Sequence, residues 1–153
     1  MMFMCKVVTK DFKIIGMKHK GYFNDYGETV PKAAQQFLEY AKDIPNNTGL
    51  EVTVYEPPKQ PTQLEGIFLV GMLVNEHNDF VPEGMEYMHI QHSYAVIKGK
   101  GTEMGNLYSV LDKWILEQSY DRATPEQYII EVYHPVQDDV EDVEVYIPLK
   151  INE

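Results

Sequence analysis

Apolar and polar residues follow one another along this chain with periods that change from segment to segment, and each period predicts an element. In residues 30–41 the apolar side chains recur at the spacing of an amphipathic helix. Residues 50–55 (LEVTVY) alternate with a period of two, the pattern of a half-buried strand. Apolar runs at 12–18 and 66–74 predict two further strands. The first half is therefore predicted to fold as strand–helix–strand–strand.

The second half repeats this order of patterns. Residues 87–98 predict a long strand, and residues 128–133 and 143–150 predict two more. Between them lies a helix with a regular apolar stripe, formed by Leu107, Val110, Leu111, Trp114 and Ile115. The polar segment 75–84 that joins the halves is too short for a free linker between independent domains.

Two short sequence echoes support a duplication. VYEP at 54–57 returns as VYHP at 132–135, which is 78 residues later. KHKG at 18–21 resembles KGKG at 98–101, which is 80 residues later. Two similar offsets in the same order indicate a copied unit with a small change of length between the two anchors.

These patterns predict a single α+β domain over residues 1–153. It consists of two strand–helix–strand–strand modules, at about 1–76 and about 85–153, related by a pseudo-twofold axis and built on antiparallel sheets. One helix per module covers one face of a three-stranded sheet. We therefore expect both helices on one side of the molecule and a ligand groove on the other side.

Strand alternation indicates which side chains face that groove. The middle strand of each module has one wholly apolar face, expected under the helices, and one mixed face, expected in the groove. On the mixed faces, the repeat aligns Tyr55 with Tyr133 and Thr53 with Glu131. Glu131 has no acidic counterpart, which predicts an anionic anchor for a cationic ligand. The alternative is an ordinary solvent-exposed glutamate, because lone glutamates are mostly exposed.

Composition narrows the classes of function. The chain carries 24 acidic and 13 basic residues, a net charge of −11, which disfavours direct nucleic-acid binding because duplex binding needs basic side chains. Its single cysteine, Cys5, excludes an intramolecular disulfide and a zinc site of several thiolates. We predict a cytoplasmic protein without a metal or cofactor. No stretch approaches the roughly 18 apolar residues of a membrane span, so no membrane partner is predicted.

The second half also resembles a known family. Residues 94–117, followed by YIIEVYHP at 128–135, resemble the second half of the GyrI-like small-molecule-binding domain. That bacterial effector-binding domain occurs in the gyrase inhibitor and in drug-sensing transcription regulators such as BmrR and Rob. The resemblance extends over residues 12–149, and it implies a duplicated strand–helix–strand–strand fold.

The most specific motif of the resemblance is E-x-Y followed by proline, here Glu131, Tyr133 and Pro135. The pair Gly21-Tyr22 matches a second feature of the family. In that family the matching glutamate lies at the base of the groove and meets lipophilic, often cationic ligands, with aromatic residues around it. The resemblance thus implies ligand-binding roles for Glu131, Tyr133 and Tyr22.

Four further ligand-binding candidates come from the repeat and the strand faces rather than from the motif. They are Tyr55, Phe68, Met17 and Trp114. For Trp114 the alternative is plain core packing, because it belongs to the apolar stripe of its helix.

Three functions remain open at this point. The first is a stand-alone module that binds lipophilic, cationic compounds, a form of multidrug recognition. The second is a hydrolase of reactive electrophilic natural products that uses Glu131 as general base or acid. The third is an inhibitor or regulator that docks on a larger protein such as DNA gyrase. The helix-turn-helix of the family's regulators is absent from this sequence, so a complete DNA-binding regulator is not expected.

Overall fold

In the computed structural model, which describes residues 4–76, 80–134 and 141–151, each half of the chain contributes a strand–helix–strand–strand unit. The elements of the first half are β1 (Cys5–Tyr22), the 3-10 helix η1 (Phe23–Asp25), α1 (Tyr26–Ala41), β2 (Asn47–Tyr55) and β3 (Glu65–Val74). Those of the second half are β4 (Glu86–Lys100), the 3-10 helix η2 (Gly101–Glu103), α2 (Met104–Glu117), β5 (Asp121–Arg122), β6 (Ile129–His134) and β7 (Asp142–Lys150). Pro135 of the predicted motif lies outside the described residues.

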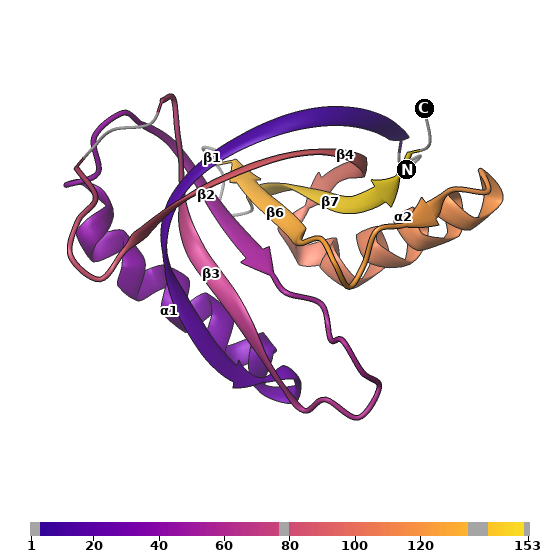
Figure 1. Ribbon diagram of the computed structural model, residues 1–153, viewed down its shortest axis with the longest axis horizontal. Coiled ribbons are helices and arrows are strands. Elements are labelled where there is room, and N and C mark those ends of the chain that lie inside the picture. Colours follow the sequence, from indigo (N-terminus) through magenta and orange to yellow (C-terminus); the bar gives the residue numbers. More distant parts are fainter. Residues whose placement is uncertain (1–3, 77–79, 135–140, 152–153) are drawn as a thin grey trace.

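The strands form one antiparallel sheet that closes on itself (Figure 1). The strand order is β4–β1–β3–β2–β6–β7–β5, and β4 pairs in addition with β7. All strands except the two-residue β5, which attaches to β7, therefore form a ring. The α+β class, the antiparallel pairing and the helix in each unit confirm the predicted fold class.

The repeat is visible in the strand pairing as a pseudo-twofold axis. β2 pairs with β6 so that Thr53 lies opposite Glu131, and β1 pairs with β4 so that Asp11 lies opposite Gln91. These partners are 78 and 80 residues apart, which are the offsets of the two sequence echoes. In a twofold-related antiparallel pair, equivalent residues face one another only where the axis passes. The axis therefore passes between Thr53 and the unmatched carboxylate of Glu131.

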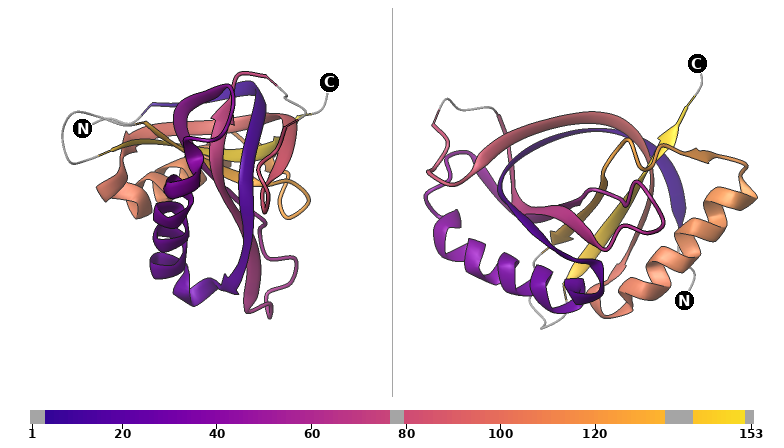
Figure 2. Two further views of the ribbon diagram at one scale, coloured as in Figure 1. Left: turned by 90° about the vertical axis from the view of Figure 1, so that its left-hand side faces the viewer. Right: turned by 60° about the horizontal axis from the view of Figure 1, so that its bottom comes forward.

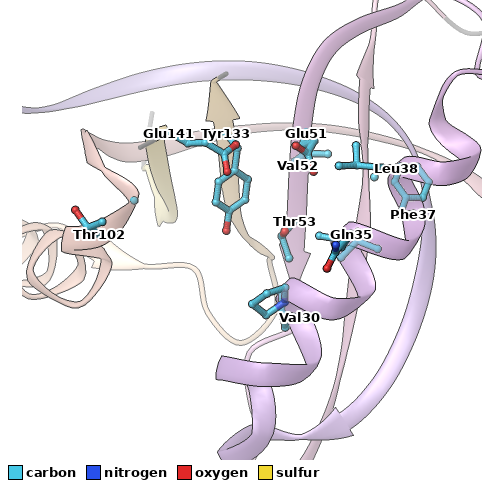
Figure 3. Close-up of a pocket in the computed structure, with 15 residues that line it drawn as sticks. Val30, Gln35, Phe37, Leu38, Glu51, Val52, Thr53, Thr102, Tyr133 and Glu141 are labelled. Carbon is cyan, nitrogen blue, oxygen red and sulfur yellow. The ribbon is translucent and has the colours of Figure 1, made fainter. Parts of the chain in front are cut away.

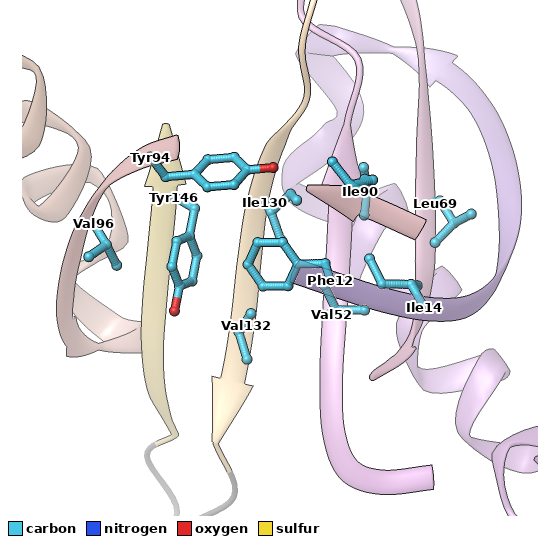
Figure 4. Close-up of a cluster of buried hydrophobic side chains, with 11 residues drawn as sticks. Phe12, Ile14, Val52, Leu69, Ile90, Tyr94, Val96, Ile130, Val132 and Tyr146 are labelled. Atoms are coloured by element: carbon cyan, nitrogen blue, oxygen red, sulfur yellow. The ribbon is translucent and has the colours of Figure 1, made fainter. Parts of the chain in front are cut away.

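Three aromatic rings pack together inside the closed sheet (Figure 4). Phe12 meets Tyr94 and Tyr146 edge to face, with ring centroids 5.6 and 5.1 Å away, and all three side chains are buried. Apolar side chains from the surrounding strands complete this cluster. Each edge-to-face pair contributes about 0.5–1.5 kcal/mol beyond its burial of area. The inside of the ring is therefore a packed core.

The wholly apolar faces of β2 and β6 belong to this core. Val52, Val54, Ile130 and Val132 are all buried in it. The prediction that these faces lie under the helices is therefore wrong. A closed sheet has an inside of its own, and that inside buries the apolar faces without a helix.

Each helix instead covers outward faces of strands from its own half (Figure 2). α1 packs through Val30 and Phe37 on β1 and β3, and α2 packs through Leu107 and Leu111 on β4 and β7. Both helices lie on the same side of the molecule, as predicted. The outward, mixed faces of β2 and β6 are left between them.

α1 begins four residues before the segment that the apolar spacing predicts. It follows η1 directly and starts at Tyr26, so Pro31 falls within the helix rather than in its first turn. Proline lacks the N–H that would bond to the carbonyl of Gly27. Gly27 is exposed, so water can satisfy that carbonyl.

Two glycines allow β1 and β3 to pair closely under α1. Gly16 lies opposite Gly71 in the strand pairing. A Cβ on Gly71 would lie 2.5 Å from the carbonyl oxygen of Ile15 and 3.0 Å from the Cα of Gly16. Both neighbours are backbone atoms and cannot turn away, so this crossing has room only for glycine.

Candidate ligand-binding site

A cavity of about 460 Å³ lies between α1 and the outward faces of β2 and β6 (Figure 3). Its α1 wall is mostly apolar and includes Val30, Ala34 and Leu38. Gly101 and Thr102 of η2 contribute to the lining from the second half. The cavity is thus on the helix side of the sheet. The prediction of a groove on the side away from the helices is wrong, because that side of β2 and β6 faces the filled core.

The sheet wall of the cavity is polar. Glu51, Thr53 and Tyr133 line it from the mixed faces of β2 and β6, as the strand alternation predicts. Glu141 joins them from the position just before β7. The backbone N–H of Gly101 donates to the Glu141 carbonyl oxygen at 2.8 Å, which holds Glu141 beside η2.

The two carboxylates of this wall influence each other. Burial raises the pKa of Glu51 above its ordinary value, and the nearby charge of Glu141 raises it further. Among the described residues that line the cavity, none is Lys, Arg or His. The wall therefore carries negative charge that no basic side chain of the lining balances.

Glu131 lies behind this wall, with 4% of its surface exposed. Three tyrosine hydroxyls donate hydrogen bonds to its carboxylate. Tyr108 of α2 donates to Oε2 at 2.6 Å, Tyr55 of β2 donates to Oε1 at 3.0 Å, and Tyr133 of β6 also donates to Oε1. A buried carboxylate without donors would be very unfavourable, so this three-tyrosine network is what makes the position of Glu131 tolerable.

All three tyrosines are held in their protonated form. Burial raises the pKa of Tyr55, of Tyr108 and of Tyr133 far above its ordinary value of 10, and the charge of Glu131 raises each further. The hydroxyls therefore remain donors throughout the physiological pH range.

Tyr133 connects the network to the cavity. Its hydroxyl is bound to Glu131, and the same side chain lines the cavity. Of the described residues that form the lining, none is Glu131, Tyr55 or Tyr108. Glu131 thus influences the cavity through Tyr133 rather than by direct contact.

A second carboxylate on a neighbouring strand offers a useful comparison. Tyr146 donates to Glu144 Oε2 at 3.0 Å, and Glu144 also pairs with His134. The Glu144 side chain is 24% exposed and does not belong to the cavity lining that the structure describes. It is a tyrosine-bound glutamate outside the candidate site.

The structure brings three of the seven predicted ligand-binding residues into one network, namely Glu131, Tyr133 and Tyr55. Phe68 and Met17 lie instead in the cluster under α1. Phe68 is buried and stacks on His19 with ring centroids 5.3 Å apart, and Met17 packs against the same cluster.

Tyr22 and Trp114 lie apart from the network. Tyr22 is 54% exposed at the end of β1, where it lines a separate hollow with Leu64. Trp114 packs against the cluster under α2, with its ring centroid 5.9 Å from that of Tyr120. The described lining of the main cavity includes neither side chain.

Tyr108 is the network residue that the sequence reasoning missed. It follows Leu107 at the edge of the apolar stripe of α2, where a tyrosine is typical of helix packing. The repeat holds a signal for it. Counted from the first residue of each helix, Tyr108 takes the place of Val30, so the second module has a hydroxyl where the first has a methyl group.

No metal centre is evident in the described part of the chain. Over those residues, no three His, Cys, Asp or Glu side chains are grouped as a metal ion would require.

The family model described as "Integron-associated effector binding protein" (Cass2) matches residues 7–149. The chain belongs to this family. The match takes in both modules of the chain, with the cavity and the three-tyrosine network. The protein is therefore an effector-binding protein of the GyrI-like fold, a class whose ligands are small molecules, and the predicted family resemblance is confirmed.

Solved structures share this fold at low sequence identity. An integron cassette protein from the mobile metagenome of Vibrio cholerae is 12% identical, with a TM-score of 0.68 and 97% of both chains covered. The C-terminal domain of EcmrR is 15% identical, with a TM-score of 0.66 over 98% of this chain and 99% of that domain. A hydrolase from Listeria innocua is 9% identical, with a TM-score of 0.51 over 95% and 91% of the two chains.

No curated protein sequence matches this chain. In the parts of the chain that the structure describes, none of the helices has the length and apolar character of a membrane span.

Proposed function

We propose that this protein binds lipophilic compounds that carry a positive charge, in the cavity between α1 and the outward faces of β2 and β6. The observation that carries this proposal is the make-up of the cavity wall. Apolar side chains of α1 face Glu51 and Glu141, and the described lining includes no basic side chain. A cation with an apolar body fits such a wall, because its charge balances the carboxylates while its body leaves water.

Glu131 contributes to this binding from the base of the site. The Tyr133 hydroxyl donates its hydrogen bond to Glu131, and this makes the phenol ring richer in electrons. A cation over the face of a tyrosine ring is attracted by about 0.5–2 kcal/mol. Glu131 therefore strengthens cation binding through Tyr133 while remaining buried itself.

The proposed role is that of a cytoplasmic bacterial protein that senses or sequesters several related compounds. A cavity of about 460 Å³ is within the size range of sites for drug-sized ligands. A wall of mostly apolar contacts accepts many shapes, since such contacts are not directional. Both properties support multidrug recognition rather than a single tightly defined ligand.

Equilibrium titration with ethidium, a fluorescent lipophilic cation, tests the proposal. Wild type is expected to bind, and Ala34→Trp is expected to abolish binding because the indole fills the cavity from the α1 wall. Glu131→Gln is expected to weaken binding by about threefold, the equivalent of about 0.7 kcal/mol, because the Tyr133 ring remains and only part of its cation–π attraction is lost. Its matched control is Glu144→Gln, which changes a tyrosine-bound glutamate outside the cavity and is expected to bind as wild type does.

Two results would contradict this proposal in different ways. If wild type does not bind the cation, or if Ala34→Trp binds it as well as wild type, the cavity is not the site. If Ala34→Trp loses binding but Glu131→Gln and Glu144→Gln both match wild type, the cavity is the site and Glu131 has no part in it.

Hydrolysis of electrophilic compounds is a second candidate, favoured by the contact between Tyr133 and Glu131. A tyrosine that lines a cavity and donates to a buried carboxylate has a base within reach of its own proton. The hydrolase from Listeria innocua has the same fold. Incubation with epoxide or strained-ring substrates, followed by mass spectrometry, separates the two functions, because a binding protein returns the compound unchanged.

A further inference from the structure

One end of the cavity gathers carboxylates around a tyrosine ring. Figure 3 shows Tyr133 between Glu141 and Glu51, and all three residues line the same cavity. Glu51 lies directly opposite Tyr133 in the β2–β6 pairing, so their Cβ atoms lie about 4.5–5.5 Å apart. Each carboxylate is thus within reach of a group placed over the ring.

The opposite wall of the same cavity has a different character. Val30, Ala34 and Leu38 present apolar surface from α1. A ligand that fills the cavity therefore meets hydrocarbon along one part of its length and carboxylates at one end. This division describes an amphiphile with a localised positive headgroup, rather than a compound whose charge is spread over its whole surface.

The number of positive charges expected on the headgroup follows from how much of the negative charge of Glu51 and Glu141 the protein itself neutralises. Over the described residues, the ion pairs of the chain leave Glu51 and Glu141 without a basic partner. The two charges repel each other, as the raised pKa of Glu51 beside Glu141 also indicates. Glu131 lies diagonally across the strand pair from Glu51, with Cα atoms about 7–8 Å apart, so a third carboxylate belongs to this part of the sheet. A single positive charge would leave this end of the cavity negative.

We propose that this end of the cavity selects headgroups with two neighbouring positive charges, one facing Glu51 and the other facing Glu141, with the Tyr133 ring between them. The ligand class is an apolar group joined to two ammonium groups by a short alkyl linker. This inference rests on the proposed function. It adds the number of positive charges on the ligand and assigns their recognition to Glu51 and Glu141.

Three dansyl probes with a common fluorophore test the selection. One ends in a hydroxyl group, one in a single ammonium group, and one in two ammonium groups joined by a short alkyl linker. Wild type is expected to bind the dication about tenfold more tightly than the monocation, and the neutral probe most weakly. Glu51→Gln and Glu141→Gln are each expected to remove most of this tenfold preference and to leave the affinity for the neutral probe unchanged. Glu39→Gln is the matched control. Glu39 is exposed on α1 outside the cavity lining, and its replacement changes the net charge of the protein by the same amount as Glu51→Gln or Glu141→Gln does.

The outcomes separate this inference from the proposed function. If Glu51→Gln and Glu141→Gln keep the preference for the dication, or if Glu39→Gln loses it as they do, these carboxylates do not select the headgroup and the cavity proposal stands. If wild type binds all three probes equally, both statements about charge are wrong. If wild type binds none of them, or if Ala34→Trp binds them all as wild type does, the cavity proposal fails and the present inference fails with it.

Discussion

Replacing Glu131 by leucine measures what the three-tyrosine network contributes to the fold. The change removes the acceptor of three hydroxyls at a position that is 4% exposed. A buried hydroxyl that loses its partner destabilises the fold by about 1–3 kcal/mol, and the lower figure applies to half-buried tyrosines such as these. Burial of the apolar leucine side chain stabilises the fold by about 1 kcal/mol and offsets part of this loss. We expect a net destabilisation of about 2–3 kcal/mol.

The sign of a second substitution gives the sharper test. In wild type, Tyr108→Phe removes the 2.6 Å hydrogen bond to a charged acceptor and is expected to destabilise the fold by about 1.5–3 kcal/mol. In the Glu131→Leu background the same change removes a hydroxyl that has lost its acceptor, so it is expected to stabilise the fold by about 1 kcal/mol. Tyr94→Phe is the control. The Tyr94 hydroxyl is buried without a partner among the described residues, so its removal is expected to stabilise the fold by about 1 kcal/mol to the same extent in both backgrounds.

Thermal unfolding followed by circular dichroism is the assay. For a chain of this size, 1 kcal/mol corresponds to about 2–4 °C in Tm. Glu131→Leu is therefore expected to lower Tm by about 4–12 °C, and adding Tyr108→Phe is expected to raise it again. The reasoning is refuted if Tyr108→Phe lowers Tm equally in both backgrounds, because that result would mean that the hydroxyl does not depend on Glu131.

Three further outcomes are expected. Gly71→Ala should destabilise the fold by about 1–3 kcal/mol in urea unfolding, because its Cβ meets the backbone of β1 at 2.5 Å; a stability equal to wild type would show that the strands can separate. The pKa of Glu51 is raised above 4.5, so its ionisation weakens the fold as pH rises through the raised value. Glu51→Gln should therefore have a higher Tm than wild type at pH 7 and the same Tm at pH 4, and a lower Tm at pH 7 would contradict this. Tyr133→Phe keeps the ring in the cavity but cuts its bond to Glu131, so titrations should show weaker binding of ethidium and unchanged binding of the neutral dansyl probe.

The sequence predicted the parts of this fold that are local or repeated. The two echoes aligned Thr53 with Glu131, and the structure makes these residues direct partners across β2 and β6. Alternation along the middle strands also separated the apolar faces from the faces that line the cavity. Both inferences depended on a period of a few residues or on a repeated segment. Such patterns can be recognised in a sequence without any knowledge of long-range contacts.

What the sequence left undetermined depends on contacts between distant segments. An apolar strand face indicates that the face is buried, but it does not indicate which element buries it. The apolar faces of β2 and β6 were therefore predicted to lie under the helices, whereas they lie in the interior that forms when β4 pairs with β7. That single error put the groove on the wrong side. Tyr108 was missed for a related reason, because only the packing of α2 beside β6 shows that its hydroxyl has Glu131 as its acceptor.

Closure of the sheet limits how the arrival of a ligand can be communicated to another molecule. The β2–β6 and β1–β4 pairs join the halves at two places on the ring, so the halves cannot swing apart like a hinge without breaking backbone hydrogen bonds at both. Movement is left to what lies outside the ring, chiefly α1 and η2. Leu38 lines the cavity and is also 43% exposed to solvent, with Tyr40 exposed close by. The outer surface of α1 is therefore the place where a partner molecule could distinguish the ligand-bound protein from the free protein.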